Sequence, residues 1–246
     1  MTMMTPEAKK KIEEMQRQLF LNQELDIAAE IIRGGLSLLQ VSRMFNQRYF
    51  PTLILLANGL ERLLKIVLVL HTRNDESRWL SQKEHKALGH DLKGLNLKVF
   101  ERCFTAEHLK RPITHPDKEF LDSDLLLKEI LDIMSAFATK GRYAYLDGTA
   151  DPTLAFDAPD RLWDYMRTSM LSPDELSLLI HSDQHQEIHA LINKRLLTVI
   201  ERYIRALIRI MAYSQGSEGR KYASSTELFK YLLLDDDKLG TLIHEL

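Results

Sequence analysis

Glu61 and Lys65 are the charged residues whose spacing is most informative, because they interrupt an otherwise apolar tract between Leu53 and Leu70. Residues four positions apart face the same side of a helix, so this carboxylate and ammonium can form an ion pair. Charged groups on the apolar face of a helix need partners once they are buried. We therefore predict a buried polar network around this pair, with His90 or Arg142 as a further member. The network can be structural or functional.

Three histidines, His181, His185 and His189, recur at intervals of four residues. On one continuous helix they would share a face and could present imidazoles to zinc. The alternative is a polar first helical turn with solvated histidines, because a helix start near Ser182 or Asp183 leaves His181 outside the helix. We favour the alternative, and the sequence predicts no cofactor.

Arginines form a second periodic set near the C-terminal end, at Arg195, Arg202, Arg205 and Arg209. Three of them are spaced by seven residues, so they can form a stripe that meets phosphate groups. The same pattern is also typical of a solvated helix face, on which Glu201 can pair with Arg205.

Apolar residues recur at helical spacing through most of the chain, which predicts an all-α fold. We expect one or two helices from Pro6 to about Arg48, weakest at Gly34–Gly35, with apolar surface from Leu19, Ile27, Ile31, Leu36, Leu39 and Met44. Further helices are expected from Pro51, over Leu92–Phe104, from Asp117 to a glycine C-cap at Gly141, after Ser172, and from about Gln184 to Tyr213. The expected architecture is an up-and-down bundle of four or five main helices.

Glycine, proline and aspartate interrupt the helical period in several places. The segment 72–81, the segment 111–116 and the linker 214–221 are predicted as loops. Residues 143–182 are predicted as a loop-rich insertion before the last long helix. We therefore divide the chain into a bundle over residues 1–215 and a short helical appendage over 216–246.

Composition narrows the class of protein. The chain has 246 residues, a formal net charge of −2 and a single cysteine, Cys103. This charge argues against a protein whose main task is to coat nucleic acid, and one cysteine excludes an intrachain disulfide. The charged residues within the apolar tract at Leu53–Leu70 argue against a membrane span, and the N-terminal residues lack the apolar core of a signal peptide. A cytoplasmic location is expected.

Three motifs resemble those of the HEPN superfamily (higher eukaryotes and prokaryotes nucleotide-binding domain). An A…E…LK pattern is matched by Ala57, Glu61, Leu64 and Lys65; an HDL-x-x-L segment by His90, Asp91, Leu92 and Leu95; and an Arg-Tyr pair by Arg142 and Tyr143. Their order agrees with the family, and they cover residues 50–143 directly. The resemblance implies a helical bundle that forms homodimers and acts in bacterial stress response or antiviral defence, including toxin–antitoxin systems.

The resemblance also implies two functional classes. Many members are metal-independent ribonucleases with an Arg-x(4–6)-His motif, in which arginine holds the phosphate and histidine transfers protons. Here Arg142 is followed by Tyr143, Ala144, Tyr145, Leu146, Asp147 and Gly148, without a histidine. Arg78–His85 and Arg102–His108 have such a spacing elsewhere, at a frequency expected by chance.

The sequence therefore leaves three hypotheses. The first is a non-catalytic bundle that binds a nucleotide, RNA or a partner protein through Glu61, Lys65, His90, Asp91, Arg142, Tyr143, Arg195 and Arg202. The second is a ribonuclease in which Arg142 contacts the phosphate and His90 or Tyr145 carries the proton. The third is a structural assembly module. We favour the first, which requires His90, Asp91 and Arg142 to border one crevice.

Overall fold

The computed structural model describes residues 5–42, 49–104, 106–155, 158–181, 184–214 and 216–244. Helices account for most of this part of the chain, which contains no β-strand, so the predicted all-α class is confirmed. The helices are α1 (Pro6–Val41), α2 (Phe50–Glu76), α3 (Gln82–Ala87), α4 (Leu92–Cys103), α5 (Ala106–Leu109), α6 (His115–Ser123), α7 (Leu125–Thr139), α8 (Ala144–Asp147), α9 (Pro159–Ser169), α10 (Pro173–His181), α11 (His185–Ser214) and α12 (Gly216–Ser225). The short 3-10 helices are η1 (Pro112–Thr114), η2 (Gly141–Tyr143), η3 (Pro152–Ala155), η4 (Glu227–Tyr231) and η5 (Asp236–Lys238).

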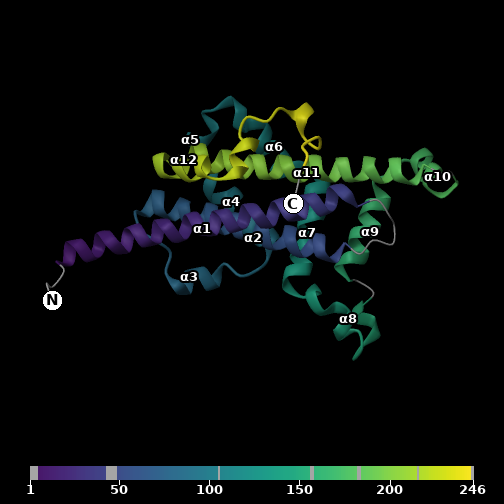
Figure 1. The fold of residues 1–246 in the computed structure, drawn as a ribbon, viewed down its shortest axis with the longest axis horizontal. Helices are drawn as coiled ribbons and strands as arrows, with labels where there is room; N and C mark the ends of the chain where they lie inside the picture. The colour runs from purple at the N-terminus through teal and green to yellow at the C-terminus, as the bar shows by residue number, and fades with distance from the viewer. Residues whose placement is uncertain are drawn as a thin grey trace.

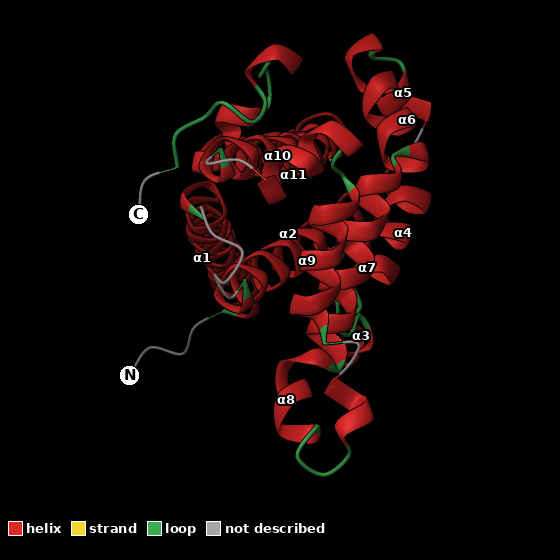
Figure 2. Cartoon of the chain, turned by 90° about the vertical axis from the view of Figure 1, so that its right-hand side faces the viewer, coloured by secondary structure: helices red, strands yellow, loops and turns green. Residues whose placement is uncertain are grey.

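Helix α2 lies at the centre of the molecule and packs against α1, α4, α7 and α11 (Figures 1 and 2). Its side chains Leu53, Leu56, Leu60, Leu63, Leu64 and Val67 are all fully buried. The tract that looked most apolar in the sequence is therefore the centre of the core. No helix of the described ranges combines the length and apolarity needed to cross a bilayer.

Of the one or two helices predicted before residue 48, the structure has one, and the Gly34–Gly35 pair does not break it. Gly35 lies within α1 where a β-carbon would come within 2.7 Å of the Leu56 side chain on α2. The missing side chain allows the two antiparallel helices to approach closely. The predicted extension of this helix through Met44 to Arg48 lies outside the described residues.

The inward face of α1 also differs from the prediction. Leu36 and Leu39 are buried as expected, whereas Leu19 and Ile27 are exposed. The buried face is formed instead by Leu21, Leu25, Ala28 and Ile32. Helix α1 therefore has apolar residues on two opposite sides.

Several helix boundaries differ from their predictions. Helix α2 continues to Glu76 into the predicted loop, where Arg73 forms an ion pair with Glu14 of α1. The expected helix from Asp117 is divided at Asp124, whose side chain caps α7 by accepting a hydrogen bond from the Leu127 amide. The predicted C-cap of this helix, Gly141, does not adopt a left-handed conformation.

The predicted insertion at 143–182 is largely helical. Figure 1 shows α8 projecting from the body of the molecule, whereas α9 returns to pack against α7. Trp163 and Met166 of α9 are fully buried. The helix predicted after Ser172 is confirmed as α10, and Ser172 and Glu175 form reciprocal side chain–backbone hydrogen bonds at its start.

The C-terminal segment is not a separate appendage. Helix α12 occupies most of the predicted linker, and Tyr222, Leu228 and Tyr231 belong to the same buried core as α1, α2 and α11. His244, near the C-terminal end, is buried against Glu201 of α11 at 2.6 Å. Residues 216–244 therefore complete the core.

Candidate functional site

The predicted polar network around Glu61 is present. Its Oε1 atom accepts a hydrogen bond from Nζ of Lys65 at 2.7 Å and lies 2.9 Å from Nδ1 of His90. The Glu61 side chain is 10% exposed and that of His90 is 65% exposed, so an inner carboxylate orients an outer imidazole. The Glu61–Lys65 ion pair and its contact with His90 are confirmed.

Asp91 is the N-cap residue of α4 and has a structural role. Its carboxylate accepts a hydrogen bond from the hydroxyl of Ser135 on α7, and this bond is the main reason that the pKa of Asp91 lies below its usual value. A β-carbon at Gly94 would lie 2.7 Å from Oδ2 of Asp91, so glycine there leaves room for the carboxylate above the first turn of α4. Asp91 is thus a link between α4 and α7.

Arg142 lies in a different place. It belongs to η2 (Gly141–Tyr143) and lines a pocket of ≈ 370 Å³ with Tyr143, Tyr145 and the start of α2. Neither His90 nor Asp91 lines this pocket, and no ion pair of Arg142 is present within the described ranges. The single crevice predicted from the motifs is therefore not formed, because Arg142 follows Ser135 by almost two helical turns.

Tyr145, the alternative proton carrier, belongs to α8 and lines the same pocket as Arg142. Its hydroxyl donates a hydrogen bond to Oδ2 of Asp160 at 2.8 Å. Burial is the main reason that the pKa of Tyr145 is raised above its usual value of 10.0. The phenol therefore stays protonated near neutral pH and bonded to Asp160.

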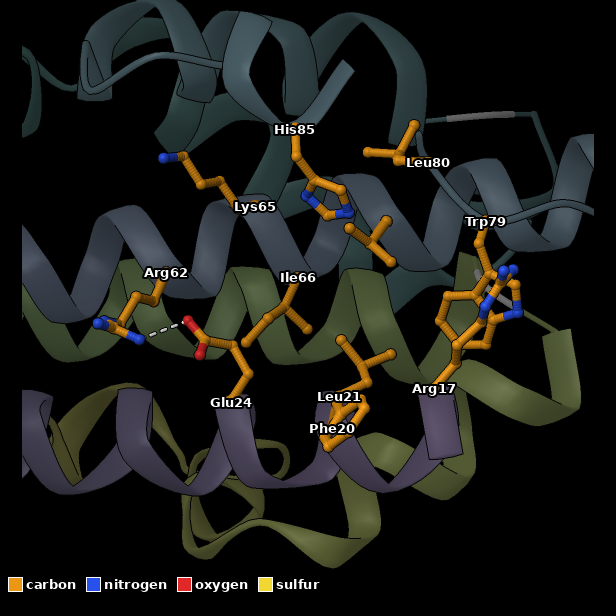
Figure 3. A pocket seen from close by; sticks show the side chains of 11 residues that line it. Arg17, Phe20, Leu21, Glu24, Arg62, Lys65, Ile66, Trp79, Leu80 and His85 are labelled. Atoms are coloured by element: carbon orange, nitrogen blue, oxygen red, sulfur yellow. Dashed lines mark hydrogen bonds and ion pairs between the residues drawn. The ribbon is translucent and has the colours of Figure 1, made fainter. Parts of the chain in front are cut away.

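The pocket that adjoins the Glu61 network lies between α1, α2 and the connection to α3 (Figure 3). It has a volume of ≈ 450 Å³. Basic, aromatic and aliphatic side chains line it, among them Arg17, Phe20, Arg62, Lys65, Trp79 and His85. We call it the α1–α2 pocket. Lys65 belongs to both the pocket and the Glu61 network.

The charges of the α1–α2 pocket are partly compensated. Arg62 forms an ion pair with Glu24 at 2.6 Å across the two helices. Trp79 donates a hydrogen bond from Nε1 to Glu14 at 2.8 Å, which fixes the indole ring at the rim. Arg17 is exposed and forms no ion pair or hydrogen bond with any other described residue. The pocket thus offers one uncompensated guanidinium beside two aromatic rings.

Sequence reasoning missed most of this pocket. Its side chains come from three segments, residues 17–24, 62–69 and 79–85, and Lys65 is the one lining residue among the predicted binding residues. The only sequence signal was the adjacency of Lys65 to the motif residue Glu61.

The arginine stripe of α11 is engaged within the molecule. Arg195 forms an ion pair with Glu175 at 2.6 Å, and the guanidinium of Arg202 lies 4.4 Å from the ring centroid of Phe120. Arg209 bonds to Asp117, and Arg205 to Asp236, not to Glu201 as predicted. These contacts favour a structural role for all four arginines over phosphate binding.

The three histidines do not share one helix. His181 is the last residue of α10, whereas α11 begins at His185, and the predicted start at Asp183 lies outside the described residues. His189 is buried with Nδ1 3.2 Å from Nη2 of Arg167, so the prediction of a solvated residue is wrong there. Across the described part of the chain, no three metal-binding side chains come together.

No protein-family model matches the chain, no curated protein matches its sequence, and no solved structure matches its fold. The resemblance to the HEPN superfamily therefore stays a prediction that depends on the three motifs.

Proposed function

We propose that this protein binds a nucleotide, either free or within single-stranded RNA, in the α1–α2 pocket and does not cleave it. The observation that carries the proposal is the exposed guanidinium of Arg17 beside Phe20 and Trp79 in a pocket of ≈ 450 Å³. Aromatic rings bind nucleobases by stacking, and a guanidinium binds phosphate through paired hydrogen bonds. The HEPN-like motifs support the same ligand class.

Binding would rearrange the ion pairs of the pocket. Arg62 and Lys65 contact Glu24 and Glu61 in the absence of ligand, and a phosphate group can compete with these carboxylates for the two cations. The carboxylates of Glu24 and Glu61 repel anions in general. A nucleotide offsets this repulsion by stacking its base on an aromatic ring, whereas inorganic phosphate has no base to stack. This arrangement favours nucleotides over inorganic phosphate. A cytoplasmic role in defence or stress response follows from the resemblance.

The test compares Arg17→Ala with Lys140→Ala, which removes the same charge from an exposed residue at the end of α7. We expect Arg17→Ala to raise the Kd for labelled single-stranded RNA about tenfold, the loss typical of one charged hydrogen bond, and to lower the salt dependence of binding. Lys140→Ala should leave the Kd unchanged. Fluorescence anisotropy with RNA and with a labelled mononucleotide distinguishes the two ligand forms. Equal losses in both variants, or no binding, would contradict the proposal.

A ribonuclease is the second candidate, because Glu61 orients His90 as a carboxylate orients a catalytic imidazole. The outer face of this imidazole is open to solvent, whereas His108 is fully buried and cannot reach a substrate. Incubation with mixed single-stranded RNA in EDTA distinguishes the candidates. Cleavage that is lost in His90→Ala would favour the nuclease; intact RNA with retained binding would favour the non-catalytic bundle.

A further inference from the structure

Helix α3 is held in place by the segments at its two ends. None of its residues, Gln82–Ala87, is buried. Within the described ranges, no hydrogen bond or ion pair links a side chain of α3 to α1, α2 or α4. On either side of the helix, Leu80 and Leu88 are partly buried and pack against the core. Helix α3 therefore has two attachment points and no buried face between them.

Two opposite sides of α3 border a pocket. His85 lines the α1–α2 pocket, whereas Glu84 and Ala87 line a second pocket of ≈ 200 Å³, which also contacts α2 and α4. At about 100° per residue, His85 and Ala87 point about 160° apart, so the two pockets lie on opposite faces of the helix. A segment with few buried contacts moves at a low cost in free energy. The space on both faces therefore allows α3 to tilt about its two attachment points.

The hydrogen bonds of α3 are internal to its own segment, so the helix can move as one piece. Glu84 accepts two hydrogen bonds from the Arg78 guanidinium, at 2.7 and 2.9 Å, and forms a capping box with Ser81. After the helix, the chain passes through Gly89, which has a φ of 68° and at which a β-carbon would meet no atom within 4 Å. Hinges are often small residues at the end of an element, and Gly89 has the freedom that a hinge needs.

We infer that α3 is a lid, which tilts over the α1–α2 pocket and brings His85 into contact with a bound nucleotide. Figure 3 shows the imidazole of His85 pointing from α3 toward Ile66 of α2, on the opposite wall of the pocket from Phe20 of α1. Phe20 is 62% exposed, so a base stacked on it keeps its other face open to solvent. Closure of the lid covers that face with the imidazole. The inference rests on the proposed nucleotide site and adds His85 to its binding residues.

Disulfide trapping tests the motion without any ligand. In the double variant Glu24→Cys/His85→Cys, the two cysteines lie on the α1 wall and the α3 wall of the pocket, and a disulfide requires their α-carbons to come within about 7 Å. We expect diamide to form this intramolecular disulfide about tenfold faster than in Asp26→Cys/His85→Cys, because Asp26 lies about 160° around α1 from Glu24. The wild-type chain is the control for the buried Cys103. Equal rates in the two variants, or no disulfide in either, overturn the lid.

Dissociation kinetics test the role of His85. His85→Ala should raise the dissociation rate of labelled AMP or single-stranded RNA about tenfold and leave the association rate unchanged, because closure follows binding. Lys86→Ala, on the same helix but outside the lining of both pockets, should change neither rate. An unchanged dissociation rate in His85→Ala overturns the inference. A wild-type chain that binds neither probe contradicts the proposed function instead, and the trapping experiment then decides the lid by itself.

Discussion

Burial shifts the pKa of individual side chains in this protein and so determines their protonation state. His108 is fully buried, with Nδ1 2.5 Å from the Ser214 hydroxyl and its ring edge-to-face with Phe104. Burial is the main reason that its pKa is lowered to about 4, and the nearby charge of Arg111 adds to the effect. The folded protein therefore contains the neutral imidazole over a range in which the unfolded chain is protonated.

This difference predicts a pH-dependent stability. Between pH 6.5 and about 4 the unfolded state binds one more proton at His108 than the folded state, so the free energy of unfolding decreases as the pH falls through this range. The full effect is up to about 3 kcal/mol. Urea unfolding at a series of pH values should show a shallower decrease for His108→Gln than for the wild type.

A second variant is the control for the other titrating groups. His85→Gln, at an exposed position, should follow the wild-type profile. Asp164, whose pKa is raised to about 6 mainly by burial, contributes in the opposite direction in all three proteins, so the comparison isolates His108. Parallel profiles for His108→Gln and the wild type would show that His108 is not the cause.

At the scale of helices, small residues determine how closely α1 and α2 approach. A β-carbon at Gly35 would lie 2.7 Å from two atoms of the Leu56 side chain and 3.1 Å from the Leu56 backbone nitrogen. The reciprocal contact occurs at Gly59, where a β-carbon would lie 2.6 Å from the Ile32 side chain and 3.0 Å from its backbone nitrogen. The helices interlock at both positions.

Gly35→Ala should therefore destabilise the protein, although alanine is the better helix former. The expected loss is about 1–3 kcal/mol, because the backbone contact requires the two helices to separate. Gln16→Ala, on the exposed side of the same helix, should change stability by less than about 0.5 kcal/mol. Denaturant midpoints measure both, and a more stable Gly35→Ala protein would refute close packing at this site.

At the scale of the whole molecule, a buried ionic cluster joins segments that are distant in the chain. Asp117 of α6 is fully buried, and its two carboxylate oxygens lie 3.0 and 3.1 Å from Nη1 of Arg209 on α11. Arg209 also donates from Nε to the Leu232 carbonyl at 2.9 Å, which ties the C-terminal segment to α11. Burial raises the pKa of Asp117 even though Arg209 and Arg205 lower it. The charged form of the carboxylate therefore depends on these cationic partners.

Asp117→Asn keeps the volume of the side chain but leaves Arg209 buried without its counter-charge. We expect a loss of about 3–5 kcal/mol in the free energy of unfolding. Arg33→Ala removes an exposed ion pair with Glu227 and should cost less than about 1 kcal/mol. Similar losses in the two variants, measured by chemical denaturation, would argue that the buried cluster does not hold these segments together.

Local chemistry made part of this molecule predictable. The helix start after Ser172, the start of α4 at Leu92 and the Glu61–Lys65 pair each depend on residues within four positions of one another, and all three are confirmed. Loop predictions were weaker: packing against the core keeps α9 and α12 helical in segments whose glycine, proline and aspartate residues are typical of turns.

The sequence by itself determined the all-α class and the inner polar pair, because helical periodicity and spacing within one turn are properties of the local chain. Only the tertiary structure decided that Arg142 lies apart from His90, that Arg209 bonds to Asp117 92 positions away, and that Arg17, Lys65 and Trp79 line one pocket. The physical reason is that each of these contacts depends on the angle and register at which separate helices pack, and close contacts such as that of Gly35 with Leu56 set this geometry across the core.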